Sequence, residues 1–239
     1  MGEFIWRLIY IFCCFLLLFE SEDRGEQNQI AGNTVIEQKR KRLLREVTLA
    51  EDERRDLNYD LFQLAILTEN ETRKIKACYE KLVSSLRVII LHSPTDEKKE
   101  IYKSKMRDYC EEFIEMVDHR IAPHFWVATS IKGHFLRLKA DYLRYLFEIH
   151  PKCGIYQVRA HNAYTEAKAF FTQNHLTKTV EWYRLRLNYA ALLYLDGFPT
   201  AAMFICQQLL KSTKSKLIDT TMEQRIRRNV EFFKRACLG

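Results

Sequence analysis

The sequence predicts an all-α protein of about nine antiparallel helices, and three features carry this prediction. Glycine and proline are scarce, with 7 and 4 residues in a chain of 239, and both residues interrupt long helices. Hydrophobic residues make up 47% of the chain, which is enough for a core and excludes a wholly disordered protein. Apolar residues also recur every three or four positions, the period of a helix with one buried face.

Each expected helix is an apolar stripe that stops at a helix-breaking segment. The clearest stripe steps by four, three, four and three residues: Tyr102, Met106, Tyr109, Phe113 and Met116. Breaks that contain proline or glycine fall at residues 93–94, 123, 151–154 and 197–199. We therefore expect helices at residues 36–55, 57–67, 69–91, 96–121, 127–149, 155–173, 178–195, 200–214 and 219–235.

The N-terminal segment, residues 1–20, contains an apolar run from Leu8 to Phe19 that Arg7 precedes. The run is short for a membrane span and resembles the hydrophobic region of a signal peptide. An uncleaved membrane anchor, a cleaved leader and a start codon assigned too far upstream are all compatible with it. Residues 21–35 are polar and predict a linker, so we expect one helical domain over residues 36–239.

The 7 cysteines are scattered and odd in number, which favours reduced thiols and a cytoplasmic protein over a disulfide framework. Anchoring to a membrane through residues 8–19 is the alternative. No metal or cofactor is expected, because the nearest candidate ligands, His150, Cys153 and His161, lack a fourth partner.

One helix carries four charged residues on a single face. Arg137, Asp141, Arg144 and Glu148 lie at positions i, i+4, i+7 and i+11. Asp141 is one turn from both arginines and could hold both guanidinium groups, and guanidinium groups that are already held bind phosphate at little further ordering cost. The alternative is a solvated ladder of ion pairs, which the spacing alone favours.

Residues 135–146, which carry most of this ladder, resemble the signature helix of the 14-3-3 family. Further segments resemble the family in the same order along the chain: residues 79–90, 110–123, 163–167, 186–194, 199–202 and 222–229. The resemblance extends over about residues 45–235 and is weakest at its N-terminal end.

The resemblance implies a single-domain, cup-shaped helical adaptor and not an enzyme. Such a protein binds phosphoserine and phosphothreonine peptides of client proteins in an amphipathic groove, and so regulates signalling and client localisation. It implies a homodimer or a heterodimer with another 14-3-3-like chain, and no specific nucleic acid. The alternative is a divergent helical scaffold whose net charge of +7 attracts acidic peptides, lipid surfaces or RNA without a need for phosphate.

The resemblance assigns phosphate binding to Arg87 and Arg144, with the hydroxyl of Tyr145 as a further donor. Arg137 takes the position of a lysine in the family's groove, and Asp141 is the acid that orients the arginine.

Four more residues follow from the same alignment of motifs. Asn188 and Asn229 match the asparagines that hydrogen-bond the peptide main chain, and an amide can donate and accept at once. Leu187 and Ala191 match residues of the groove's apolar wall.

The sequence also departs from the family pattern. Glu80 stands where the third helix of the family supplies a phosphate-binding lysine, and Arg225 and Phe232 replace aliphatic wall residues. The first two helices match least, and these form the family's dimer interface. We therefore expect a weaker homodimer than is usual, or pairing with a better-matched relative.

Overall fold

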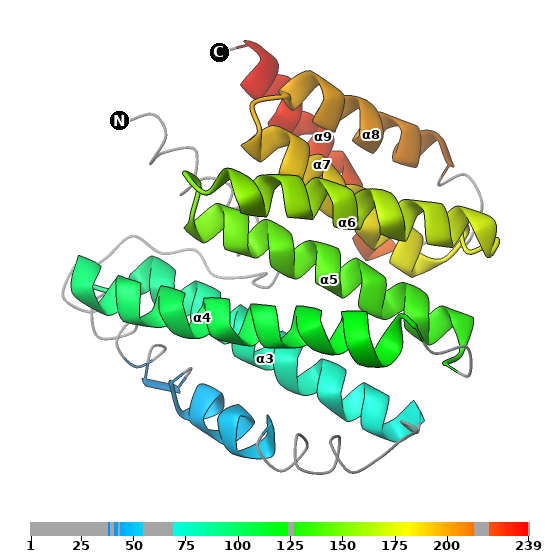
Figure 1. The fold of residues 1–239 in the computed structure, drawn as a ribbon. Coiled ribbons are helices and arrows are strands. Elements are labelled where there is room, and N and C mark those ends of the chain that lie inside the picture. Colours follow the sequence, from blue (N-terminus) through cyan, green and yellow to red (C-terminus); the bar gives the residue numbers. More distant parts are fainter. Residues whose placement is uncertain are drawn as a thin grey trace. The chain divides into compact units, whose positions relative to one another are not determined.

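The computed structural model describes residues 38, 41–42, 44–54, 69–123, 127–212 and 220–238. In these residues helix is the only regular secondary structure, which confirms the all-α prediction (Figure 1). Contacts divide the chain into two compact units, residues 1–113 and residues 114–239.

The helices follow the expected order. Residues 44–54 are helical, within the first predicted helix. The later elements are α3 (Glu69–His92), α4 (Asp96–Met116), a π-helical turn (Val117–Ile121), α5 (Thr129–Ile149), α6 (Gly154–Gln173), α7 (Val180–Leu195), α8 (Pro199–Ser212) and α9 (Thr220–Leu238). The helix predicted at residues 57–67, the N-terminal segment 1–20 and the linker 21–35 lie outside the described residues.

The helix predicted at residues 96–121 is not α-helical to its end. Its last turn widens into the π-helical turn, which closes when the backbone N–H of Ala122 donates to the carbonyl oxygen of Val117 at 2.8 Å. Val117 and Ile121 both remain buried through this change. Periodicity cannot reveal such a turn, because one widened turn leaves the apolar stripe almost unchanged.

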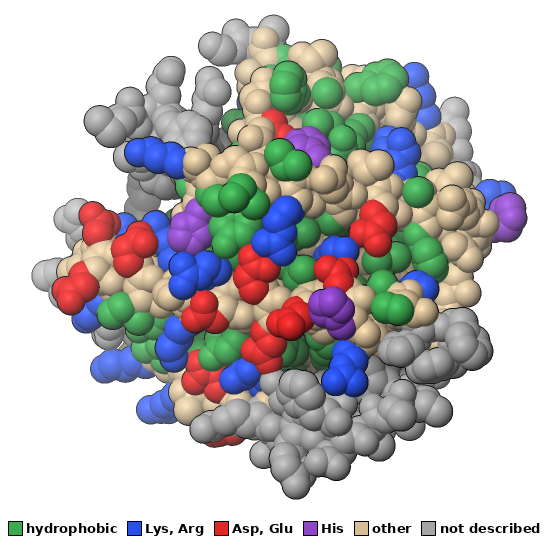
Figure 2. All heavy atoms as spheres, in the orientation of Figure 1, with side chains coloured by type: hydrophobic (Ala, Val, Ile, Leu, Met, Phe, Trp, Pro, Cys, Tyr) green, Lys and Arg blue, Asp and Glu red, His purple; other side chains and the backbone are tan. Residues whose placement is uncertain are grey.

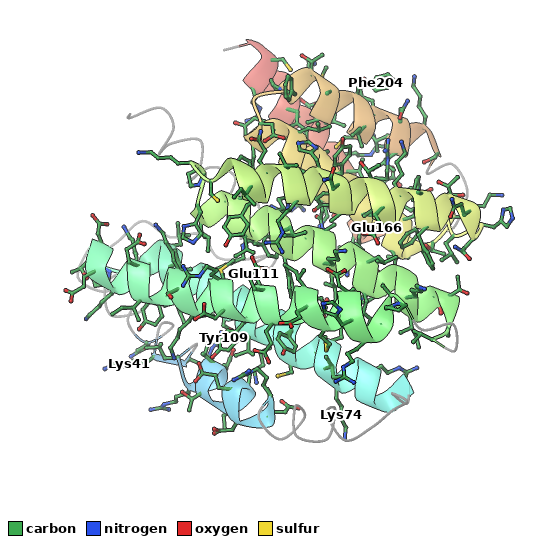
Figure 3. The ribbon with its side chains drawn as sticks, in the orientation of Figure 1. Lys41, Lys74, Tyr109, Glu111, Glu166 and Phe204 are labelled. Atoms are coloured by element: carbon green, nitrogen blue, oxygen red, sulfur yellow. The ribbon has the colours of Figure 1, made fainter. Side chains whose placement is uncertain are left out.

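In the first unit, polar contacts fix the segment 44–54 to α3 and α4. Arg54 donates to both carboxylate oxygens of Glu112 at 2.8 and 2.6 Å, and the hydroxyl of Tyr79 donates to the same carboxylate at 2.8 Å. The hydroxyl of Tyr109 donates to Glu51, and Figure 3 shows Tyr109 on the side of α4 toward this segment. Burial and the contact with Glu51 raise the pKa of Tyr109. Residues of the predicted apolar stripe therefore also join helices through their hydroxyl groups.

In the second unit, α5 packs against α6 and α7, and α8 packs against α7 and α9 (Figure 1). At Gly133 of α5, an added Cβ would lie 3.3 Å from the ring of Phe171 on α6, so the two helices pack tightly there. Lys139 of α5 reaches Asp118 in the π-helical turn at 2.5 Å and Glu166 of α6, labelled in Figure 3, at 3.0 Å. A hydrophobic cluster joins α7, α8 and α9 and includes Leu187, Cys206, Ile226 and Phe233.

Replacement of Ile226 tests whether this cluster holds α9 in place. Ile226 is fully buried, so Ile226→Ala should lower the free energy of unfolding by about 2–4 kcal/mol, from lost burial and the cavity left behind. Its neighbour Arg227 is exposed, and its described ion pair is with Glu223 on the same helix, so Arg227→Gln should change stability by less than about 0.5 kcal/mol. Urea unfolding of both variants measures the difference, and equal midpoints would contradict the packing of α9.

Candidate functional site

The charged face of α5 is buried. The side chains of Arg137, Asp141, Arg144 and Glu148 are 6%, 2%, 0% and 4% exposed. The solvated ladder that spacing alone favoured is therefore wrong. Packing of α5 against α6 and α7 accounts for the difference, and spacing within one helix carries no information about what covers that helix.

Each arginine of α5 pairs with the acid four residues after it. Arg137 donates to Asp141, and Arg144 donates to Glu148 at 2.9 Å. The other carboxylate oxygen of Asp141 accepts from the hydroxyl of Tyr164 on α6 at 2.7 Å. The hydrogen bonds of Asp141 thus go to Arg137 and Tyr164, and the prediction that Asp141 holds both arginines is corrected: Glu148 is the acid bonded to Arg144.

Arg144 is a buried cation held in a fixed position. Its guanidinium carbon lies 4.4 Å from the ring centroid of Tyr145. Burial alone would lower the pKa of Arg144, but Glu148, with smaller contributions from Tyr164, Tyr145 and Asp141, raises it above the ordinary value. The guanidinium therefore stays charged, although a phosphate could reach it only if the side chains that cover it move.

Glu181 of α7 joins three basic side chains. It accepts from Arg137 at 2.6 Å and from Arg184 at 2.7 Å, and it contacts Nδ1 of His134 at 3.0 Å. Burial would raise the pKa of Glu181, but the hydrogen bond with His134 and the charge of Arg137 hold it well below its ordinary value. This carboxylate links α5 to α7, and the sequence analysis did not identify it.

The position of Glu181 follows from how α7 begins. Thr179 caps the helix, and its hydroxyl accepts from the backbone N–H of Trp182 at 3.3 Å. Glu181 then falls in the first turn, where the helix dipole favours an acid. The Thr179–Glu181 spacing marks a helix start, but it gives no sign of the arginines that the acid meets.

Arg87 lies on α3, in the first unit, and is 9% exposed. Its charge acts on the buried thiol of Cys110: burial and Glu111 raise the pKa of this thiol, and Arg87 lowers it in part. The convergence of Arg87 with Arg144 and Tyr145 on one phosphate stays a prediction.

The predicted peptide-binding residues occupy α7 and α9 of the second unit. Asn188 and Asn229 are both half-buried. Leu187 is 3% exposed and packs into the cluster with α8 and α9, so it contributes to the core. Ala191, one turn after Leu187, is 8% exposed. Phe232 packs its ring against Tyr194 at 5.0 Å between centroids, so it also has a structural role.

The potential metal ligands have other contacts. His161 of α6 bonds through Nε2 to the carboxylate of Asp196, which also accepts from Gln157 at 2.9 Å. This polar contact fixes the end of α7 to α6. Among the residues that the structure describes, no three His, Cys, Asp or Glu side chains gather as a metal site. No helix in the described part of the chain is long and apolar enough to cross a membrane, and residues 8–19 lie outside that part.

The family comparison covers most of the chain. The family model described as 14-3-3 protein matches residues 35–233, a range that includes every residue of the predicted phosphopeptide site. A search of curated proteins finds no match.

The depressed pKa of Glu181 predicts loss of stability in acid. A carboxyl whose pKa is lower in the folded state stabilises the fold above its unfolded pKa, near 4.5, and this contribution is lost as the pH falls toward the folded value. Glu181→Gln should reduce the free energy of unfolding at pH 7 by about 2–4 kcal/mol, because it leaves buried cations with less compensation. Urea unfolding at a series of pH values should show the two proteins converge below about pH 4.5. A constant difference between pH 7 and pH 3 would refute this assignment.

Proposed function

The chain belongs to the 14-3-3 family, and on this basis we propose that it binds phosphoserine and phosphothreonine peptides of client proteins. Members of this family are adaptors and not enzymes. The proposed role is therefore to hold a phosphorylated segment in an amphipathic groove, and so to regulate the signalling and the localisation of the client.

The observation that supports this proposal best is the charged guanidinium of Arg144, fixed between Glu148 and the ring of Tyr145. A buried cation is costly to maintain, and a core of the same shape is commonly as stable without one. A cation whose orientation is already fixed suits the recognition of a phosphate dianion once the side chains that cover it move. Arg137, held by Asp141 and Glu181, is a second arginine fixed in the same way on the same helix.

The charge distribution favours this function over a scaffold that acts through bulk positive charge. On the face drawn in Figure 2, acidic and basic side chains are interspersed over the helices and form no continuous basic field. A face of mixed charge attracts lipid or RNA weakly. Phosphate recognition instead needs only a few fixed donors.

We further propose a cytoplasmic location and a homodimer or heterodimer weaker than is usual for the family. The described thiols include Cys78, Cys110 and Cys206, all buried and free. Burial raises the pKa of Cys78 to about 11, so this thiol stays protonated and unreactive at neutral pH.

The phosphate requirement can be tested directly on the full chain. A labelled phosphoserine peptide should bind at least about tenfold more tightly than the same peptide with serine, because each charge-assisted hydrogen bond contributes about 1.5–3 kcal/mol. Tyr145→Phe and Asn188→Ala should each weaken phosphopeptide binding by about three- to tenfold, since each removes one hydrogen-bonding group. Replacement of Arg144 is avoided, because it would leave Glu148 buried without its cation.

Fluorescence anisotropy measures these affinities, with Arg227→Gln as a control for loss of one positive charge at an exposed site. Equal affinity for the phosphorylated and unphosphorylated peptides would favour the phosphate-independent scaffold instead.

A second test uses Glu80, which stands where the family has a lysine. Glu80 is on α3, its side chain is 41% exposed, and Lys76 lies 3.9 Å from it. If the groove holds phosphate near this position, Glu80→Lys should tighten phosphopeptide binding by about 1–3 kcal/mol, roughly 5- to 100-fold. The gain should shrink as salt rises.

Glu100→Lys is the matched control, because Glu100 is an exposed acid on α4 that also pairs with a lysine, Lys103. An equal gain in both variants would show a general charge effect, and no gain at low salt would place the phosphate away from Glu80.

A further inference from the structure

Arg186 differs from the other arginines near the charged face of α5. Arg137, Arg144 and Arg184 each hydrogen-bond a carboxylate. Arg186 is half-buried on α7, yet within the described part of the chain no acidic side chain forms a hydrogen bond or ion pair with it.

The surroundings of Arg186 are aromatic and apolar. Trp182, Arg186 and Tyr189 lie at i, i+4 and i+7 on one face of α7, and the guanidinium carbon is 5.7 Å from the Trp182 ring centroid. The groups that act on the charge of Arg186 from nearby are Tyr189 and the buried thiol of Cys206 on α8. Burial lowers the pKa of Arg186, and these two groups only partly offset the effect.

This face is distinct from the proposed phosphopeptide site. Arg184, Asn188 and Ala191 share another side of α7, at i, i+4 and i+7. Two residues along a helix correspond to a rotation of about 200°, so Arg186 and Arg184 leave the helix on nearly opposite sides.

A half-buried cation without an acid destabilises the fold, and such residues are typical of binding sites. We propose that Arg186, with Trp182 and Tyr189, is a second binding site that takes a carboxylate of an acidic, unphosphorylated peptide segment of a partner protein. The guanidinium binds the carboxylate through two parallel hydrogen bonds, and the two rings contact apolar side chains on either side of the acid.

The charge balance selects a carboxylate over a phosphate. One guanidinium neutralises one carboxylate, so the bound pair carries no net charge beside Trp182 and Cys206. A phosphate dianion would leave about one uncompensated negative charge in these apolar surroundings, which is unfavourable.

The test uses the full chain and an end-blocked, dye-labelled peptide of alternating glutamate and phenylalanine. Fluorescence anisotropy should show that Arg186→Gln weakens binding by at least about tenfold. Arg186→Lys keeps the charge but not the planar guanidinium, so its affinity should lie between those of the wild type and Arg186→Gln. Arg227→Gln carries the same charge change at an exposed site and should stay within about twofold of the wild type. The counterpart peptide with glutamine in place of glutamate should not compete.

Two further measurements separate this site from folding and from the proposed function. Arg186→Gln should unfold at the same temperature as wild type or about 1–3 °C higher, because it removes a half-buried charge that lacks an acid. It should bind the phosphoserine peptide with the affinity of the wild type. If neither the wild type nor Arg186→Gln binds that peptide, the result counts against the proposed function and not against this site.

Wild-type affinity of Arg186→Gln for the acidic peptide would overturn the proposal, as would a clear fall in its unfolding temperature, which would make Arg186 structural. Displacement of the peptide by an equal concentration of inorganic phosphate would overturn the assignment to a carboxylate.

Discussion

The second unit is organised by the need to pair the buried charges of α5. Arg137 and Arg144 are almost completely covered, so each requires an acid within hydrogen-bonding distance. α5 supplies Asp141 and Glu148 from its own face, and α7 supplies Glu181. A shift of α5 against α7 would separate Arg137 from Glu181 and break one of the ion pairs that compensate this buried cation. Electrostatics therefore fixes the relation of these helices more strictly than hydrophobic contact alone, which tolerates small displacements.

The acids that pair with the buried arginines also hold these arginines in position to bind an anion. A flexible arginine loses side-chain entropy when it binds an anion, but a guanidinium already held by a carboxylate has lost most of it during folding. The acids beside Arg137 and Arg144 thus serve two purposes: they compensate burial, and they fix the donors. The cost is acid sensitivity, since a carboxylate such as Glu181 with a depressed pKa stabilises the fold only while it is ionised.

The sequence correctly predicted pairing within one helix, but it did not predict burial and contacts that depend on a second helix. The i, i+4 spacing correctly paired Arg137 with Asp141, and the apolar stripes located the described helices to within a few residues. The same spacing wrongly suggested a solvated ladder, because exposure depends on how α6 and α7 cover α5. Glu181 escaped notice for the same reason, as its two partners on α5, Arg137 and His134, are distant in sequence. Tyr109 was counted only as an apolar stripe residue, although its hydroxyl also joins helices.

α7 carries both the acid that pairs with α5, Glu181, and the arginine of the proposed second binding site, Arg186. It contacts α5, α6 and α8, so it has no single apolar stripe, and its polar side chains emerge between three neighbours. On the side of α5, Glu181 supplies the acid and Arg184 is paired with it. Near α8, the described groups that act on Arg186 are Trp182, Tyr189 and the thiol of Cys206. In the described part of the chain, Arg137 and Arg184 pair with an acid and Arg186 does not, so a carboxylate from another protein would complete the pattern that α5 already follows internally.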